Sequence, residues 1–370
     1  MKKCKEYATI LIAALLFSTL FWLYYKRFSF KQEEILDINQ IKNWAYQLQN
    51  ADPNEIANSG FDLVVIDYSR DGTEQMKYSP SDIAKIKRSG IIPICYISIG
   101  EAEDYRFYWN ESWYDNPPEW LGHENPDWPG CYAVKYWYEE WKEIVFAYLD
   151  KIIEQGFCGV YLDKVDEFEY WADPENGEGE YYSENQTAKW MIEFICEIAN
   201  YCRSKAGENF YIIPQNGERL LEYDNGTLLN IISGWAVEDL FYNETEPLLE
   251  SIIQERIQYL DKVYSRGKVV LVVDYVDDGT GYKGENKGRI DDFIAKARER
   301  GYIPYAARSD RALDELNVIE GVQPSDKTSG SSFPACIILL ARKHFLDLNL
   351  LKNLLMMVNN RVNNAFTLNF

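Results

Sequence analysis

Eight short apolar runs recur along the middle of the chain, and segments with helical periodicity separate them. The runs are rich in β-branched and aromatic residues, and they begin at Trp44, Phe61, Ile91, Phe157, Phe210, Ile231, Val269 and Tyr302. Between runs, apolar positions recur at steps of three and four, for example from Trp141 to Ile152 and from Leu248 to Tyr264. That spacing is typical of a helix with one buried face.

Eight strands alternating with helices predict a (β/α)8 barrel, which is an α/β fold. Glycines such as Gly156 and Gly301 stand where a helix must end before the next strand. A doubly wound open sheet is the competing fold. It would more often show about six strands, and no GxGxxG motif follows a strand in this chain.

The two ends of the chain differ from this middle part. Three lysines precede an unbroken apolar run from Ala8 to Tyr25, which as a helix would span roughly 27 Å, close to the thickness of a bilayer core. We therefore predict a transmembrane signal anchor in residues 1–30, which leaves the barrel, residues 31–322, membrane-anchored and extracytoplasmic. Residues 323–370 begin with a linker composition and continue basic and rich in Leu and Asn. We interpret them as a linker and a C-terminal appendage of unknown role.

Charge and composition exclude some functions. The chain has 59 acidic and 38 basic residues, a formal net charge of −21, so a nucleic-acid partner is not expected. It has two histidines and no CxxC or HExxH motif, so we expect neither a metal site nor a cofactor. The 11 tryptophans and 28 tyrosines offer flat apolar faces of the kind that sugar rings stack against.

Polar side chains follow the apolar runs, at the ends where a barrel of this type carries its active site. They are Asp67, Ser98, Glu101, Asp163, Asp166, Gln215, Asn216, Glu238, Asp239 and Asp274. A single Asp after a strand is often only a helix N-cap. Acids after five of the strands favour an active site at this end of the barrel, which we call the mouth.

Strand alternation selects two of these acids. In the run GVYLD, we expect Val160 and Leu162 to point towards the helices. Gly159, Tyr161 and Asp163 then face the barrel interior, so Asp163 is presented at the mouth. In the sixth run only one of Glu238 and Asp239 can face inward, and we choose Glu238 because the strand is still regular there. The acids after Asp163, namely Asp166, Glu167 and Glu169, are interpreted as N-caps or solvated charge.

Two carboxyl groups without metal ligands suit glycoside hydrolysis, in which one acid protonates the leaving oxygen and the other acts as nucleophile or base. Clustered like charges also raise the pKa of one acid, which keeps it protonated near neutral pH. The alternative is a catalytically inactive barrel that binds cell-surface polysaccharide through the same acidic mouth.

Several ordered motifs resemble glycoside hydrolase family 114, a family of TIM barrels whose characterised members are endo-α-1,4-polygalactosaminidases. The motifs are WAYQLQ, DLVVIDYSRDG, CYISIGEAEDYR, KYWYEEW, GVYLDKVD, PQNGE, AVEDLFY and GYIPYAARSDRALDEL, and they extend from Ile41 to Val322. Members of the family have also been labelled as related to cysteinyl-tRNA synthetase. This chain has no HIGH or KMSKS signature, and its charge does not suit tRNA.

The resemblance implies cleavage of α-1,4-linked galactosamine or N-acetylgalactosamine polymers. It implies that Asp163 and Glu238 are the catalytic carboxyl groups. The residues expected to bind the sugar are Asp67, Ser98, Glu101, Tyr161, Asp166, Gln215, Asn216 and Asp274. The aromatic-rich segment from Tyr105 to Trp141 contains five candidates for sugar stacking: Trp109, Trp113, Trp120, Trp128 and Trp137. Two interpretations stay open for it: a wall on which sugars stack, or packing of a long loop onto the barrel rim.

Overall fold

The computed structural model describes residues 37–324, in which eight parallel strands carry the fold. The strands are β1 (Trp44–Gln47), β2 (Leu63–Ile66), β3 (Ile92–Ser98), β7 (Gly159–Asp163), β8 (Tyr211–Pro214), β9 (Gly234–Glu238), β12 (Val269–Asp277) and β13 (Ile303–Arg308). Each lies within, or starts within, one of the eight predicted apolar runs. The strands are buried almost throughout, as parallel strands covered on both faces must be.

The strands form a closed arrangement. β1, β2, β3, β7 and β8 make one parallel sheet in that order, and β9, β12 and β13 make a second. A parallel bridge between Gln215 and Ala236 joins β8 to β9, and the backbone N–H of Ser233 donates to the carbonyl of Ile212 at 2.8 Å. At the other seam β13 lies against β1, and Trp44 Nε1 donates to the carbonyl of Ile303 at 2.9 Å. This order is that of a (β/α)8 barrel.

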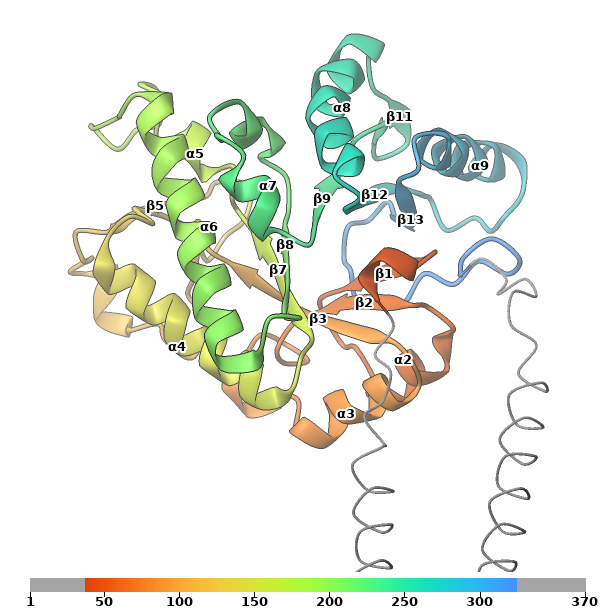
Figure 1. Cartoon of the computed structure of the whole chain (residues 1–370), viewed down its shortest axis with the longest axis horizontal. Helices are drawn as coiled ribbons and strands as arrows, with labels where there is room; N and C mark the ends of the chain where they lie inside the picture. The colour runs from red at the N-terminus through yellow and green to blue at the C-terminus, as the bar shows by residue number, and fades with distance from the viewer. Residues whose placement is uncertain (1–36, 325–370) are drawn as a thin grey trace, which may run out of the picture. The chain divides into compact units, whose positions relative to one another are not determined.

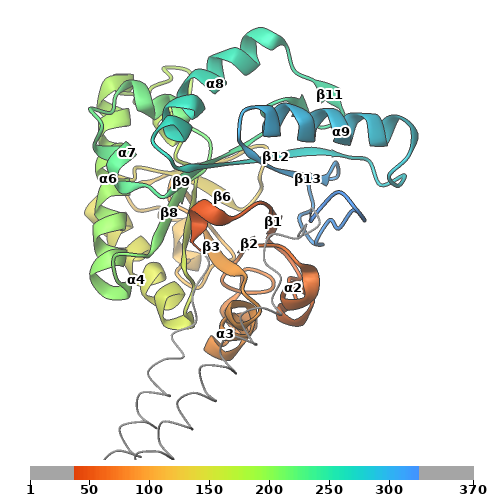
Figure 2. The same cartoon turned by 45° about the vertical axis from the view of Figure 1, so that its right-hand side comes forward.

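Helices follow the strands and cover the outside of the barrel (Figure 1). They are α2 (Pro53–Ser59), α3 (Pro80–Arg88), α4 (Glu139–Gln155), the short α5 (Glu167–Tyr170), α6 (Glu184–Ala206), α7 (Thr227–Ile231), α8 (Glu250–Ser265) and α9 (Gly284–Glu299). Figure 2 shows α8 and α9 beside β9, β12 and β13, with α4, α6 and α7 on another side. Within the described residues, no helix follows β13.

Local signals in the sequence account for several helix ends. Asp52 precedes α2, and its Oδ1 accepts hydrogen bonds from the backbone N–H groups of Asn54 at 2.7 Å and Glu55 at 3.4 Å. At the end of α4, Gly156 has a φ of 90°, a conformation that a residue without Cβ adopts without strain. The chain can therefore turn directly from α4 into β7.

A long insertion separates β3 from α4. It contains a small antiparallel sheet, in the order β4 (Glu101–Glu103), β6 (Cys131–Val134) and β5 (Leu121–Glu124). A second two-stranded piece, β10 (Tyr242–Asn243) with β11 (Glu246–Pro247), lies between β9 and α8. Short 3₁₀ turns stand at Ile38–Gln40, Glu74–Met76, Glu111–Tyr114 and Glu218–Glu222. The insertion and the β10–β11 piece both follow strand ends, so they are added at the mouth of the barrel.

The barrel interior holds a layer of aromatic rings. Trp44 lies 6.1 Å from Tyr46, 6.3 Å from Tyr161 and 5.8 Å from Tyr305, measured between ring centroids. All four side chains are buried. Such contacts between tilted rings add to the stabilisation from burial alone. The inward orientation predicted for Tyr161 is therefore observed, and Asp163 lies two residues further along the same face of β7.

The predicted anchor in residues 1–30 and most of the appendage in residues 323–370 lie outside the described residues. Among the helices of residues 37–324, none combines the length and the apolar character needed to span a membrane.

Candidate active site

Asp163 and Glu238 occupy equivalent places in the barrel. Asp163 is the last residue of β7 and Glu238 is the last residue of β9, and in both strands the four preceding residues are buried while the carboxyl residue is partly exposed. The following residue, Asp239, has a φ of 50°, which ends the regular strand. The strand alternation that selected Glu238 over Asp239 therefore agrees with the observed geometry.

The two carboxyl groups share one electrostatic environment. Burial raises the pKa of Glu238 to about 7, and the negative charge of Asp163 is the next cause. Beneath them, burial raises the pKa of Tyr161 well above its ordinary value, and the charges of Glu238 and Asp163 act in the same direction. The carboxyl groups therefore lie at the same mouth, above the aromatic layer.

Asp163 is held by two hydrogen bonds. The hydroxyl of Tyr96 donates to its Oδ2 at 2.7 Å, and the backbone N–H of Lys164 donates to its Oδ1 at 2.8 Å. Burial raises the pKa of Asp163, while the positive charge of Lys164 and both hydrogen bonds act against that rise. Lys164 has a φ of 60°, a conformation that is uncommon for a residue with a side chain. These partners fix the orientation of the carboxylate.

Glu238 is held by different partners. The hydroxyl of Tyr275 donates to Oε1, and Asn216 Nδ2 donates to Oε2 at 3.3 Å. The backbone N–H of Glu238 also donates to Asn216 Oδ1 at 3.0 Å. Asn216 has a φ of 58°, which Asn tolerates better than most residues. Asn216 was predicted to bind the sugar, and here its amide orients Glu238 at both the backbone and the side chain.

Three more predicted sugar-binding residues, Gln215, Tyr161 and Asp166, lie near this mouth. Gln215 and Tyr161 are fully buried, and within the described residues neither Gln215 Nε2 nor the Tyr161 hydroxyl has a hydrogen-bond partner. Asp166 precedes α5 without making a side-chain cap. Burial raises its pKa to about 7, and the charge of Asp163 acts in the same direction. Unpaired buried polar groups are costly unless a ligand or water satisfies them.

Two predicted sugar-binding acids are engaged inside the protein instead. Asp67 is buried and pairs with Arg106, whose Nη1 lies 2.7 Å from Oδ2, and Arg106 also pairs with Glu103 at 2.7 Å. The oxygens of Asp274 accept three backbone N–H bonds, each of 2.9 Å, from residues 240–242. The geometry favours structural roles for Asp67 and Asp274 over the predicted sugar contacts.

Glu101 and Ser98 lie in the turn that leaves β3. Ser98 Oγ donates to the carbonyl of Glu101 at 3.0 Å. Glu101 Oε1 lies 2.8 Å from Lys164 Nζ and accepts from Asn125 Nδ2 at 2.7 Å. Glu167, interpreted from the sequence as a cap or a solvated charge, is 6% exposed, and burial together with the charge of Glu101 raises its pKa. The prediction of solvated charge is therefore wrong for Glu167.

The tryptophans of the insertion mainly pack the loop against the protein. Four of the five predicted candidates contact other aromatic rings: Trp109, Trp113, Trp120 and Trp137. Trp120 is buried, and its ring lies 5.2 Å from that of Trp141 on α4. Trp128 is 55% exposed. Of the two interpretations, packing onto the rim describes these four residues, and Trp128 is the one of the five that a sugar could reach freely.

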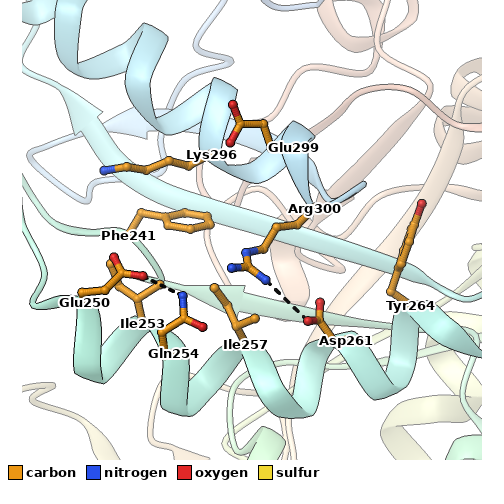
Figure 3. Close-up of a pocket in the computed structure, with 10 residues that line it drawn as sticks. All are labelled: Phe241, Glu250, Ile253, Gln254, Ile257, Asp261, Tyr264, Lys296, Glu299 and Arg300. Carbon is orange, nitrogen blue, oxygen red and sulfur yellow. Dashed lines mark hydrogen bonds and ion pairs between the residues drawn. The ribbon is translucent and has the colours of Figure 1, made fainter.

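A groove of about 570 Å³ on the outside of the barrel is unrelated to this mouth. It lies between α8 and α9, where Glu250 contacts Gln254 and Asp261 contacts Arg300 (Figure 3). None of its lining residues belongs to the predicted site. In residues 37–324, no group of three or more His, Cys, Asp or Glu side chains is arranged to hold a metal ion.

Sequence comparisons connect the chain to known proteins. The sequence model of the glycoside-hydrolase family GH114 matches residues 28–323. An uncharacterized protein of Methanocaldococcus jannaschii is 68% identical over 275 residues, which cover 74% of this chain and 78% of that protein. An uncharacterized protein of Thermotoga maritima is 56% identical over 284 residues, which cover 77% of this chain and 86% of that protein.

Two solved structures share the fold. The glycoside hydrolase domain of PelA from Pseudomonas aeruginosa superposes with a TM-score of 0.57 at 17% identity, over 75% of this chain and 98% of that domain. Ega3 of Aspergillus fumigatus, in a complex with galactosamine, superposes with a TM-score of 0.55 at 18% identity, over 77% of this chain and 96% of that one. At such identities the likeness supports the barrel architecture.

Proposed function

The chain belongs to glycoside-hydrolase family GH114, and from this premise we propose that it hydrolyses α-1,4-linked galactosamine or N-acetylgalactosamine polysaccharide with Asp163 and Glu238 as its two catalytic carboxyl groups. The observation that carries the proposal is the pair itself: two acids at the ends of β7 and β9, where burial, with the charge of Asp163 as the next cause, raises the pKa of Glu238 to about 7. The galactosamine bound in the related Ega3 structure supports the choice of sugar.

Glu238 suits the role of general acid. A carboxyl group whose pKa lies near 7 is protonated in much of the protein at neutral pH, and it can pass that proton to the leaving glycosidic oxygen. Once it has lost the proton, the Tyr275 hydroxyl and the Asn216 amide stabilise the carboxylate that remains.

Asp163 suits the role of nucleophile or base. It accepts hydrogen bonds from Tyr96 and from the backbone of Lys164, and the charge of Lys164 favours its ionised form. An ionised carboxylate facing a protonated one is the arrangement that both retaining and inverting glycosidases use. The charge on Asp163 also helps to keep Glu238 protonated before the reaction.

The acidic mouth suits a cationic sugar. A deacetylated galactosamine unit carries an ammonium group, and the chain carries a formal net charge of −21, which favours fast encounter with a cationic polymer. At the mouth, Asp166 offers a carboxyl group, and we propose it as a direct contact to the substrate. Gln215 and Tyr161 are fully buried, so their polar atoms that find no partner in residues 37–324 lie below the surface that a sugar can reach.

The experiment is an assay of the full chain on partly deacetylated poly-α-1,4-galactosamine, with Asp163→Asn and Glu238→Gln beside it. We expect the parent to release oligosaccharides and each variant to lose activity by about 10²–10⁴-fold or more. Glu299→Gln, in the groove between α8 and α9, removes a carboxylate away from the mouth and should keep full activity. Binding of the polymer without cleavage would favour the alternative of an inactive binding barrel.

We also propose that the catalytic barrel lies on the extracytoplasmic side of a membrane, because the apolar run from Ala8 to Tyr25 is long enough to anchor it. Digestion of intact cells with an external protease tests this. Cleavage of the barrel in intact cells supports the proposal, and protection until the cells are lysed contradicts it.

A further inference from the structure

A second cavity lies at the opposite end of the barrel from Asp163 and Glu238. Its volume is about 820 Å³, and its walls include Phe157 and Cys158, which precede β7, and Phe210, which precedes β8. Lys268, on the same wall, precedes β12. Because parallel strands begin at one end of a barrel and finish at the other, this basal cavity is separate from the site at the strand ends.

Four basic side chains line the basal cavity: Lys87, Arg203, Arg266 and Lys268. Lys87 and Arg203 belong to the last turns of α3 and α6, and Arg266 directly follows α8. Within residues 37–324, none of the four forms an ion pair with a carboxylate. These four cations thus share one cavity without a carboxylate partner among the described residues, in a chain that has 59 acidic and 38 basic residues.

The hydrogen bonds of these cations leave donors free. Arg203 Nη2 donates to the carbonyl of Ile231 at 2.7 Å, and Lys268 Nζ donates to the carbonyl of Ile232 at 2.6 Å. These carbonyls lie at the end of α7, where a positive charge is favourable. Arg203 Nε, however, is buried and has no hydrogen-bond partner within the described residues. Each of these carbonyl oxygens accepts one N–H bond from Arg203 or Lys268, but a neutral carbonyl does not neutralise the positive charge of the side chain.

The charges in the basal cavity do not balance. Burial lowers the pKa of Lys268, and the positive charges of Arg203 and Arg266 act in the same direction. The carboxylates on the cavity wall are Asp37 and Glu208, so four cations face two anions. The excess of two positive charges matches one phosphate dianion.

We propose that the basal cavity binds an organic phosphate. Arginine and lysine together are the usual partners of a phosphate group, because arginine presents paired N–H donors and lysine a compact charge. The apolar walls, including Phe157, Phe210 and Ile231, suit a small organic body attached to the phosphate. The volume of about 820 Å³ lies in the range of small-molecule sites and exceeds what a bare phosphate needs. Two sources share this chemistry: a soluble metabolite phosphate and the headgroup of a phospholipid.

The test is calorimetric titration of the full chain with glycerol phosphate and with inorganic phosphate. We expect saturable binding of glycerol phosphate, weakened tenfold or more in the Arg203→Gln/Lys268→Gln variant. The control is Lys189→Gln/Lys262→Gln, which removes two positive charges from the exposed surfaces of α6 and α8 and should bind like the parent.

Arg203 and Lys268 also bond to backbone carbonyls, so their replacement can disturb folding. Arg266→Gln avoids this problem, because the Arg266 side chain makes no hydrogen bond within the described residues and is exposed. We expect it to weaken binding severalfold while leaving thermal unfolding unchanged. Hydrolysis of the galactosamine polymer should be unaffected in all these variants, since the cavity lies away from the mouth.

Vesicles separate the two sources. If phosphatidylglycerol vesicles bind the parent more tightly than the Arg203→Gln/Lys268→Gln variant, the ligand is a lipid headgroup. Both chains keep the same N-terminal apolar run, so it cannot cause that difference. If vesicles do not distinguish the two chains but glycerol phosphate does, the ligand is a soluble phosphate. Absence of saturable binding, or equal binding by parent and variant, would overturn the proposal.

Discussion

Replacing Tyr275 with Phe is expected to shift the pH dependence of hydrolysis upward. The Tyr275 hydroxyl donates a hydrogen bond to Glu238 Oε1, and this bond lowers the pKa of Glu238 against the effect of burial, which raises it to about 7. A donor to a carboxylate stabilises the ionised form, so its loss favours the protonated form. Phe keeps the ring that packs under Arg311, whose guanidinium carbon lies 4.2 Å from the ring centroid.

The magnitude follows from the strength of the lost bond. A hydrogen bond to a charged group contributes about 1.5–3 kcal/mol, and 1.36 kcal/mol corresponds to one pKa unit, so the pKa of Glu238 should rise by about one to two. As general acid, Glu238 must be protonated in the free enzyme, so the alkaline limb of the kcat/KM profile reports its pKa. In the parent this limb should lie near pH 7. In Tyr275→Phe it should lie about one to two pH units higher.

The assay is kcat/KM for polymer cleavage between pH 4 and pH 10. The matched control is Tyr282→Phe, which removes a tyrosine hydrogen bond to Asp291 on the exposed surface of α9 and should leave the profile unchanged. If the alkaline limb of Tyr275→Phe stays at the same pH or moves to lower pH, Glu238 is not the general acid whose pKa the Tyr275 hydroxyl lowers.

Three further substitutions test the structure. Glu238→Gln should stabilise the protein by roughly 1–3 kcal/mol at pH 8 but not at pH 4. In the unfolded chain Glu238 loses its proton near its ordinary pKa of 4.5, whereas in the folded protein it does so at about 7. The folded protein therefore loses stability as the pH rises between these values, and Gln removes this loss. Thermal unfolding at both pH values measures the difference. Arg106→Met leaves the buried carboxylates of Asp67 and Glu103 without their cationic partner. It should lower the free energy of unfolding in urea by about 3–5 kcal/mol. A decrease of less than about 1 kcal/mol would contradict the buried ion pairs. Asp274→Asn replaces one acceptor oxygen with a donor that faces backbone N–H groups. It should lower the free energy of unfolding in urea by about 2–3 kcal/mol. An unchanged unfolding midpoint would contradict the hydrogen bonds from residues 240–242 to this carboxylate.

The eight strands could be predicted because parallel strands buried on both faces produce continuous apolar runs. Helix periodicity indicated the buried faces of the longer helices, and Gly156 marked the end of α4. The placement of Asp163 and Glu238 at the ends of β7 and β9 could be predicted because strand alternation is local. Once one residue of a strand faces the barrel interior, its neighbours two positions away do as well.

The roles of Asp67 and Asp274 could not be predicted, because their partners come from distant parts of the chain. Asp67 looked like an open acid at the end of β2, but Arg106 from the insertion covers it. Asp274 is the first polar residue after the apolar start of the seventh run, but β12 continues to Asp277, and Asp274 accepts hydrogen bonds from the backbone of residues 240–242. Its neighbour Tyr275 lies on the other face of β12, and the Tyr275 hydroxyl donates a hydrogen bond to Glu238.

Tyr96 shows that one missed contact had a usable signal. It lies two residues before Ser98 in β3, so the same alternation that placed Tyr161 inside the barrel also places Tyr96 there, and its hydroxyl reaches Asp163. Lys164 had no such signal. Strand alternation alone would place it on the face opposite Asp163, but a φ of 60° ends the strand there, and Lys164 Nζ reaches Glu101 at the mouth.

The most direct test of the central claim is the kcat of the Asp163→Asn/Glu238→Gln double variant beside the two single variants, on partly deacetylated poly-α-1,4-galactosamine. If the two carboxyl groups act as one unit, the double variant should be no slower than the slower single variant, because catalytic residues that work together lose activity non-additively. Losses that multiply in the double variant, or a single variant that keeps its activity, would contradict the two-carboxylate account.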